Sequence, residues 1–209
     1  DTIVLGTGAI TSAMFTNVTN VENLQFSGSA TLSSNIPFTS FDLATATGSG
    51  TLTLSSGYTN ATTVTLGSGD TVSNTSANVA LTINTTEDAF SSGMVSGGTG
   101  VDTLNITTST GTGTVTLGSG NSIDVINIVD TTVSGEAGSD IILTLASGYT
   151  VSVTVYASSL DAGTLDSTGA MNADYENLTF DASGLAAGKT ANVTGGAGAD
   201  SITGGSGND

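Results

Sequence analysis

The chain has 209 residues, 18 acids, one basic residue (Lys189), no Cys and no His, and a formal net charge of −17. This balance excludes nucleic acid and anionic membranes as partners, because binding to either needs Lys and Arg. It also excludes disulfides, thiolate metal sites and the commonest general base. The hydrophobic content of 37% is enough for a core, yet unpaired acids repel one another, so folding needs cations or widely spaced carboxylates.

Short runs of β-branched and aliphatic residues alternate with Thr or Ser and are separated by Gly, Ser and Asn. Such period-two alternation, bounded by turn residues, predicts strand after strand. In chain order the clearest runs are TLTLSSG (Thr51–Gly57), TVTLGSG (Thr114–Gly120), DVINIV (Asp124–Val129), IILTLASG (Ile141–Gly148) and YTVSVTV (Tyr149–Val155). Helical periodicity is weak, and only Phe38–Ala46 and Ala157–Asp161 are candidates for single helical turns. There is no long apolar run, so we expect no insertion into a membrane.

Several phrases recur without a fixed period: LTLSSGYT with LTLASGYT, VTLGSG twice, and ENLQF with ENLTF. A strand-and-turn unit with variable insertions is typical of an irregular solenoid. We therefore predict an all-β fold, a parallel β-solenoid with short strands and Gly-Asp turns. An ordinary antiparallel sandwich is the alternative. Residues 1–94 form a Thr-rich segment and residues 95–209 a segment with Gly-Asp repeats, within one continuous solenoid.

A nine-residue pattern, G-G-x-G-x-D-x-U-x with U a large apolar residue, occurs several times. GGAGADSIT (Gly195–Thr203) and GGTGVDTLN (Gly97–Asn105) match it in full, and GEAGSDIIL (Gly135–Leu143) departs at its second position. GGSGND (Gly204–Asp209) supplies the first six positions directly after its predecessor. The opening DTIV completes a half-repeat, so we expect the 209 residues to be a segment of a longer chain.

The glycines of the pattern allow a tight turn, with positive φ where needed. The last three positions then leave the turn as a short strand whose apolar side chain faces the inside of the coil. The inward residues expected on this basis are Ile202, Leu104, Ile142 and Ile3.

With these motifs the chain resembles the repeats-in-toxin (RTX) family of calcium-binding β-rolls, and within it the calcium-dependent surface-layer proteins of Gram-negative bacteria. The resemblance implies Ca²⁺ bound by the carboxylate at position six and by backbone carbonyls at positions one, three and five of neighbouring turns. These positions are Gly97, Thr99, Val101 and Asp102; Gly135, Ala137, Ser139 and Asp140; Gly195, Ala197, Ala199 and Asp200; and Gly204, Ser206, Asn208 and Asp209. Asp1, Asp70 and Asp124 are further candidate ligands in degenerate repeats.

Only one adjacent pair of repeats is present, whereas a regular β-roll has many, so isolated repeats would need ligands from turns that do not match the motif. The alternative interpretation is that the Gly-x-Gly-Asp runs are plain turns that need positive φ. Glu87-Asp88 and Asp161 with Asp166 are expected to be solvated loop acids.

Without His or Cys no triad, thiol or zinc site can form, so we expect no enzyme. The predicted function is a structural, calcium-dependent, secreted protein of the cell surface, whose partners are copies of itself in a layer or fibre, with surface polysaccharide as a second candidate. The alternative is a spacer or binding module of a large secreted adhesin. A third hypothesis is an ice- or surface-binding face made of rows such as Thr51-x-Thr53 and Thr114-x-Thr116.

Overall fold

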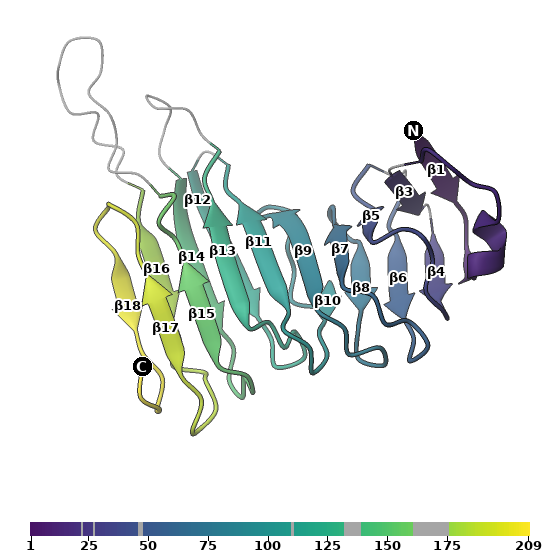
Figure 1. Cartoon of the computed structure of the whole chain (residues 1–209). Coiled ribbons are helices and arrows are strands. Elements are labelled where there is room, and N and C mark those ends of the chain that lie inside the picture. Colours follow the sequence, from purple (N-terminus) through teal and green to yellow (C-terminus); the bar gives the residue numbers. More distant parts are fainter. Residues whose placement is uncertain (22, 27, 46–47, 110, 132–138, 161–175) are drawn as a thin grey trace, which may run out of the picture. The chain divides into compact units, whose positions relative to one another are not determined.

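The computed structural model describes residues 1–21, 23–26, 28–45, 48–109, 111–131, 139–160 and 176–209 (Figure 1). Within these ranges the chain forms eighteen strands and one 3-10 helix, Ser12–Phe15. That helix has four residues, and no described helix is long and apolar enough to cross a membrane.

The strands are β1 Thr2–Leu5, β2 Gly8–Ile10, β3 Asn23–Phe26, β4 Ser29–Leu32, β5 Ser40–Asp42, β6 Thr51–Leu54, β7 Thr62–Thr65, β8 Thr71–Ser73, β9 Leu81–Thr86, β10 Val95–Ser96, β11 Thr103–Thr107, β12 Gly111–Leu117, β13 Val125–Val129, β14 Ser139–Leu145, β15 Val153–Tyr156, β16 Leu178–Asp181, β17 Ala191–Thr194 and β18 Ser201–Thr203.

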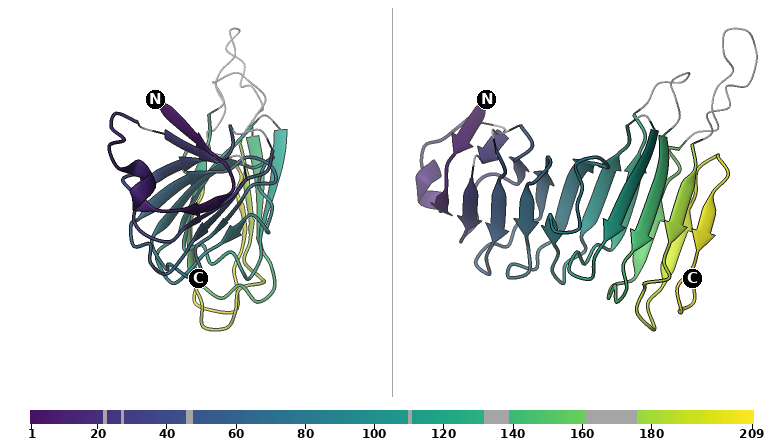
Figure 2. Two further views of the ribbon diagram at one scale, coloured as in Figure 1. Left: turned by 90° about the vertical axis from the view of Figure 1, so that its right-hand side faces the viewer. Right: turned by 180° about the vertical axis from the view of Figure 1, so that it is seen from behind.

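The odd-numbered strands form one nine-stranded sheet in the order β1-β3-β5-β7-β9-β11-β13-β15-β17. The even-numbered strands form a five-stranded sheet, β10-β8-β6-β4-β2, and a four-stranded sheet, β12-β14-β16-β18 (Figure 2). Every strand pairing whose register is described is parallel. The chain therefore changes sheet after each strand and returns one coil later, which is the path of a parallel β-solenoid. The predicted fold class is confirmed, and the antiparallel sandwich is wrong.

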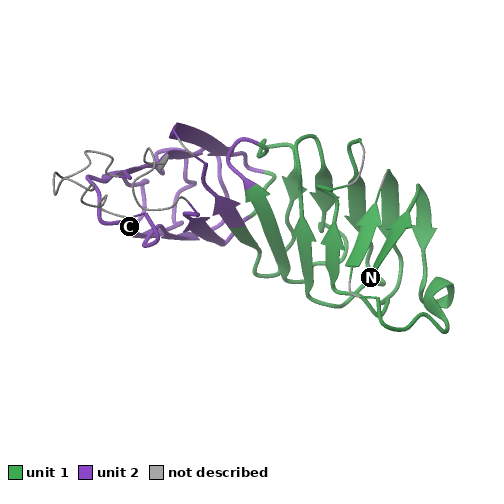
Figure 3. Cartoon of the chain, turned by 90° about the horizontal axis from the view of Figure 1, so that it is seen from above, with its two compact units in different colours: residues 1–85, 89–104, 120–122 green, residues 86–88, 105–119, 123–209 purple. Residues whose placement is uncertain are grey.

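The chain divides into two compact units (Figure 3). The first consists of residues 1–85, 89–104 and 120–122, and the second of residues 86–88, 105–119 and 123–209. The division at residue 95, drawn where the Gly-Asp repeats begin, stays a prediction.

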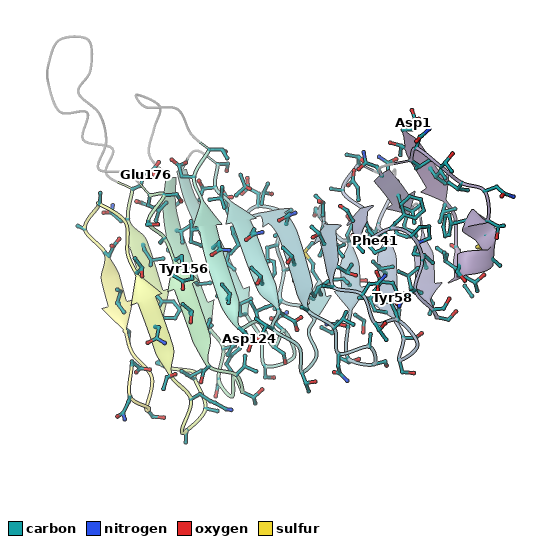
Figure 4. The ribbon with its side chains drawn as sticks, in the orientation of Figure 1. Asp1, Phe41, Tyr58, Asp124, Tyr156 and Glu176 are labelled. Atoms are coloured by element: carbon teal, nitrogen blue, oxygen red, sulfur yellow. The ribbon has the colours of Figure 1, made fainter. Side chains whose placement is uncertain are left out.

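The core of the first unit is a ladder of inward side chains in register. Leu24 pairs with Phe41, Phe41 with Val64, and Val64 with Ile83. All four are at most 1% exposed. The rings of Phe26 and Phe41 lie 5.7 Å apart between centroids, and Phe41 is labelled in Figure 4. Because the strands alternate apolar and polar residues, one face of each is buried in this ladder and the other carries Thr, Ser and Asn.

The second unit has the same construction. Val115 pairs with Leu143 and Leu143 with Phe180, and these three side chains are buried. The residues between them on β12 and β14, such as Thr114 and Thr144, alternate to the opposite face.

The recurring octapeptides LTLSSGYT and LTLASGYT occupy equivalent places in the two units, each as the end of a strand followed by a turn with a fully buried Tyr. The hydroxyl of Tyr58 shares a hydrogen bond of 2.8 Å with Thr62 Oγ1. The hydroxyl of Tyr149 accepts from the N–H of Ile123 and donates to its carbonyl, both at 2.7 Å. Burial raises the pKa of Tyr58, and the hydrogen bond from Thr62 partly offsets the rise.

Two local expectations fail. Phe38–Ala46 was a candidate for a single helical turn but contains β5, because Phe41 belongs to the inward ladder; Ala46 lies outside the described residues. Ile142 was expected inside the coil but is 36% exposed, and its neighbour Ile141 is buried instead.

Other local expectations hold in whole or in part. Leu104 is fully buried as predicted. Ile3 is half-buried, and Ile202 is 51% exposed although it pairs with the inward Phe180. In Ala157–Asp161 the N–H of Leu160 donates to the carbonyl of Ala157, which closes a turn; Asp161 lies outside the described residues.

Replacing Phe41 by Ala removes a buried ring from the ladder and leaves a cavity. We expect a loss of about 3–5 kcal/mol in the free energy of unfolding, measured by urea unfolding followed by circular dichroism in calcium-containing buffer. The matched control is Tyr156→Ala, an aromatic that is 47% exposed on β15, with an expected loss below about 1 kcal/mol. Equal losses in the two variants would contradict this core.

Candidate metal-binding turns

Three of the repeats adopt the same local conformation. Residues 97–102, 195–200 and 204–209 each bend at their third and fourth positions and are irregular on either side. After the first two of these turns a strand begins at position seven, with Thr103 and Ser201. The pattern therefore specifies a turn followed by a strand, as predicted.

The glycines of the first of these turns are required by close packing. A Cβ on Gly97 would lie 2.6 Å from Asp102 Oδ2 and 2.5 Å from the carbonyl oxygen of Asn121. A Cβ on Gly100 would lie 2.6 Å from the carbonyl oxygen of Val79. None of the glycines at positions one, two and four has a positive φ, so this turn does not need left-handed backbone. The missing side chain, and not the backbone freedom, is what these positions use.

The tandem repeats show the same contacts. A Cβ on Gly198 would collide with the carbonyl of Glu176, and one on Gly207 with the carbonyl of Lys189. Neither glycine has a positive φ. The fourth position of each turn thus lies directly against a backbone carbonyl of an earlier turn, in all three repeats.

The aspartate at position six ties its turn to the preceding coil. One oxygen of Asp102 accepts the backbone N–H of Leu81 at 3.0 Å. Asp200 Oδ1 accepts the N–H of Leu178 at 2.9 Å, and Asp209 Oδ1 accepts that of Ala191 at 3.0 Å. In each case the donor is the first residue of a strand, β9, β16 or β17.

The second carboxylate oxygen differs between the repeats. Asp102 is fully buried, and its Oδ2 accepts the N–H of Gly98 at 2.9 Å. Asp200 Oδ2 and Asp209 Oδ2 lie beside the first glycine of their own turns and accept no hydrogen bond from the described residues. The tandem pair therefore keeps a charged oxygen available, whereas a cation at Asp102 would have to displace an N–H donor.

The remaining predicted ligand positions of these turns fall into two groups. Backbone N–H groups of Thr99 and Ala199 donate to the Oδ1 atoms of Asn78 and Asn177, at 3.1 and 2.7 Å, and Ala197 donates to the carbonyl of Leu160 at 3.1 Å. The second group consists of Val101, Ser206 and Asn208, which are exposed like the first three.

The repeat that starts at Gly135 is arranged differently. Gly135 and Ala137 lie outside the described residues, and Ser139 is the first residue of β14. Asp140 Oδ1 accepts the backbone N–H and the side-chain amide of Asn177, at 2.9 and 3.0 Å. Its donor Asn177 therefore lies in the following coil, whereas the strand-start donors of Asp102 and Asp200 lie in the preceding one.

The degenerate repeats hold their acids in three ways. Asp70 is buried, and its two oxygens accept the N–H groups of Gly50 and Gly67 at 2.7 and 2.8 Å. Here Gly69 does have a positive φ of 82°, as the plain-turn interpretation requires. Asp124 is half-buried and Asp1 is exposed, and the carbonyl of each accepts an N–H from a neighbouring coil.

Two kinds of residue at these turns escaped the sequence analysis. Buried Asn side chains bond turn backbone: Asn74 Nδ2 donates to the carbonyl of Val79, and Asn121 Nδ2 donates to the carbonyls of Ser92 and Val95. The sequence feature that could have identified them is an Asn within a turn, but Asn is too frequent in the turns of this chain for that feature to single them out. The second kind is Glu87, which was expected to be solvated and is only 4% exposed.

The turns offer oxygen ligands of the kind that a hard cation binds: single carboxylates and backbone carbonyls. No group of three or more acidic side chains gathers in the part of the chain that the structure describes. Any ion at the repeat turns would therefore be held mostly by carbonyls and water, as in sites of millimolar affinity.

No protein-family model matches the chain, and neither a curated protein nor a solved structure is similar to it. The resemblance to the RTX family thus rests on the motifs and stays a prediction.

Replacing Gly100 by Ala places a Cβ against the backbone of Val79, which cannot move without shifting the neighbouring turn. We expect a loss of about 1–3 kcal/mol in the free energy of unfolding. The control is Gly93→Ala in the same unit, where a Cβ meets no atom within 4 Å and φ is not positive. Urea unfolding of both variants measures the difference, and a tolerated Gly100→Ala would contradict the close-packing role.

Proposed function

We propose that this chain is a structural, calcium-dependent extracellular protein, whose turns bind Ca²⁺ and whose folded form assembles with copies of itself into a surface layer or fibre. The observation that carries the proposal is the tandem pair of turns. Asp200 and Asp209 are each fixed by one oxygen on a neighbouring coil, and each keeps a second oxygen that accepts no hydrogen bond from the described residues.

These carboxylates are preorganised for a cation. The bond to the preceding coil fixes the orientation of each side chain, so little conformational entropy remains to be lost on binding. The two repeats follow one another without a gap and have the same conformation. Around Asp200 the proposed carbonyl ligands are Gly195, Ala197 and Ala199, and around Asp209 they are Gly204, Ser206 and Asn208.

Calcium would act on folding through charge. The chain has 18 acids and one basic residue, so repulsion opposes the compact state wherever carboxylates are not compensated. Extracellular sites have dissociation constants of about 10⁻⁴ to 10⁻³ M, so each adds about 0.4–1.4 kcal/mol of stability at 1 mM calcium. Several such sites together can decide whether the chain is folded. It would remain loose where calcium is scarce and fold outside the cell.

Self-assembly is supported by the low charge of the strand faces and by large apolar side chains exposed in the second unit. These are Val129, Ile142, Tyr156 and Ile202. The proposed function needs no catalytic step, and the chain has neither His nor Cys for a triad or a thiol site. The rows Thr51-x-Thr53 and Thr114-x-Thr116 lie in different sheets, on β6 and β12, and a face for ice or another surface stays a prediction.

Removal of calcium tests the coupling to folding. We expect a chelator to abolish the strand signal in circular dichroism and added calcium to restore it, because uncompensated carboxylates then repel across the turns. Asp200→Asn removes the free carboxylate oxygen and should raise the calcium concentration at the folding midpoint several-fold.

The control for Asp200→Asn is Asp181→Asn, which removes the same charge elsewhere in the second unit. Hydrogen bonds from the Ser183 side chain and backbone hold the pKa of Asp181 below its usual value, so the group is ionised at neutral pH. Its replacement should leave the calcium midpoint unchanged or lower it. A spectrum that does not respond to chelator would contradict the proposal.

Assembly is tested by negative-stain electron microscopy of the chain with and without calcium. We expect ordered sheets or fibres only with calcium, and loss of order on adding chelator. Elongated monomers at millimolar calcium would instead favour the spacer module of a secreted adhesin, because a spacer needs the folded coil but no contact between copies.

A further inference from the structure

The side chain of Glu87 is buried at the turn that follows β9, and Glu87 belongs to no Gly-Asp repeat in the sequence. Its Oε1 accepts two hydrogen bonds from Ser109, one from the backbone N–H and one from the hydroxyl, both at 2.5 Å. Its Oε2 is also buried and has no hydrogen-bond partner among the residues that the structure describes. A buried carboxylate oxygen without a partner is rare in folded proteins because it loses its hydration and gains nothing in exchange.

The surroundings of Glu87 supply no compensating charge. A Cβ on Gly113 would collide with Glu87 Cγ and would lie 3.2 Å from Ile141 Cδ1, so the side chain passes over a glycine beside an aliphatic residue. The chain contains one basic side chain in all, Lys189, against 18 acids. A carboxylate buried next to apolar groups without a counter-charge is stabilised by binding a cation.

A second carboxylate meets the same hydroxyl. Asp88 is exposed, and its Oδ2 lies 3.2 Å from Ser109 Oγ as an acceptor. The Ser109 hydroxyl has one hydrogen, so it can donate to Glu87 or to Asp88 but not to both at once. Two carboxylates thus converge on a single donor, and a cation would satisfy both of them where the hydroxyl cannot.

We propose that Glu87, Asp88 and Ser109 form a calcium-binding site distinct from the repeat turns. The donors are two carboxylates and a hydroxyl, an all-oxygen set that suits a hard divalent cation. The site has only two acidic side chains, and no group of three or more is found among the described residues. Water and backbone carbonyls would therefore complete the coordination. The site uses the ion of the proposed function but does not rest on the tandem turns.

The test counts calcium ions bound per chain by equilibrium dialysis with radioactive calcium, on the whole 209-residue chain. Glu87→Gln keeps the shape and the bonds from Ser109 but removes the charge, and should lower the count by one. Asp88→Asn, at an exposed position, should weaken one site several-fold without affecting folding. The control Asp181→Asn removes an equal charge from the same unit and should leave the count unchanged.

The competing state is a Glu87 that binds no ion. Glu87→Gln would then bind the full number of ions and melt at the same or a higher temperature, and this result overturns the proposal. If Glu87→Gln fails to fold, Asp88→Asn decides, because unchanged affinity and count in that variant overturn the proposal as well.

The two proposals fail separately. Loss of ions in Asp200→Asn with an unchanged count in Glu87→Gln sinks the Glu87 site alone. An unchanged count in Asp200→Asn with a lower count in Glu87→Gln contradicts calcium binding at the tandem turns and supports the Glu87 site. A wild-type chain that binds no calcium contradicts both proposals.

Discussion

In a parallel stack of short strands every turn lies against the turn of the next coil, and the polar groups trapped between them must find partners there. The carboxylate of Asp102 shows how this chain meets that constraint: it accepts an N–H from its own turn and another from the first residue of β9. The approach is possible because Gly97 and Gly100 have no Cβ. Glycine and aspartate therefore act together, since the glycine admits the neighbouring backbone and the aspartate bonds it.

The same constraint explains how a chain with almost no basic residues can bury acids. Backbone N–H groups carry partial positive charge, and those at strand starts are free to point at a carboxylate. Asp70 and Asp102 use both oxygens in this way and are buried. Where N–H groups satisfy one oxygen only, as at Asp200 and Glu87, the other oxygen is the one at which we propose a cation. The number of nearby N–H donors thus separates the acids whose two oxygens both accept hydrogen bonds from those with one oxygen that accepts none.

The strand pattern and the turns could be predicted from the sequence because both are local. Alternation places Leu52, Leu54 and Leu104 inside, and the nonapeptide specifies the same bend three times. The register of GEAGSDIIL could not be predicted, because Ile141 and Ile142 are both apolar, and a shift of one residue exchanges the two faces of the strand. Pairing with Leu178 in the next coil settles the choice in favour of Ile141, and the motif contains no information about that partner.

The partners of the acids could not be predicted because they depend on the length of the coil. Glu87 accepts a hydrogen bond from Ser109 and Asp200 accepts one from Leu178, each 22 residues away in the sequence. Asp209 accepts one from Ala191, which is 18 residues away. Variable insertions change this offset from coil to coil, so no fixed spacing in the sequence identifies a pair. A local motif can name an acid that belongs at a turn. Whether that acid ends with one unsatisfied oxygen or none is decided by the residue that the previous or next coil happens to place beside it.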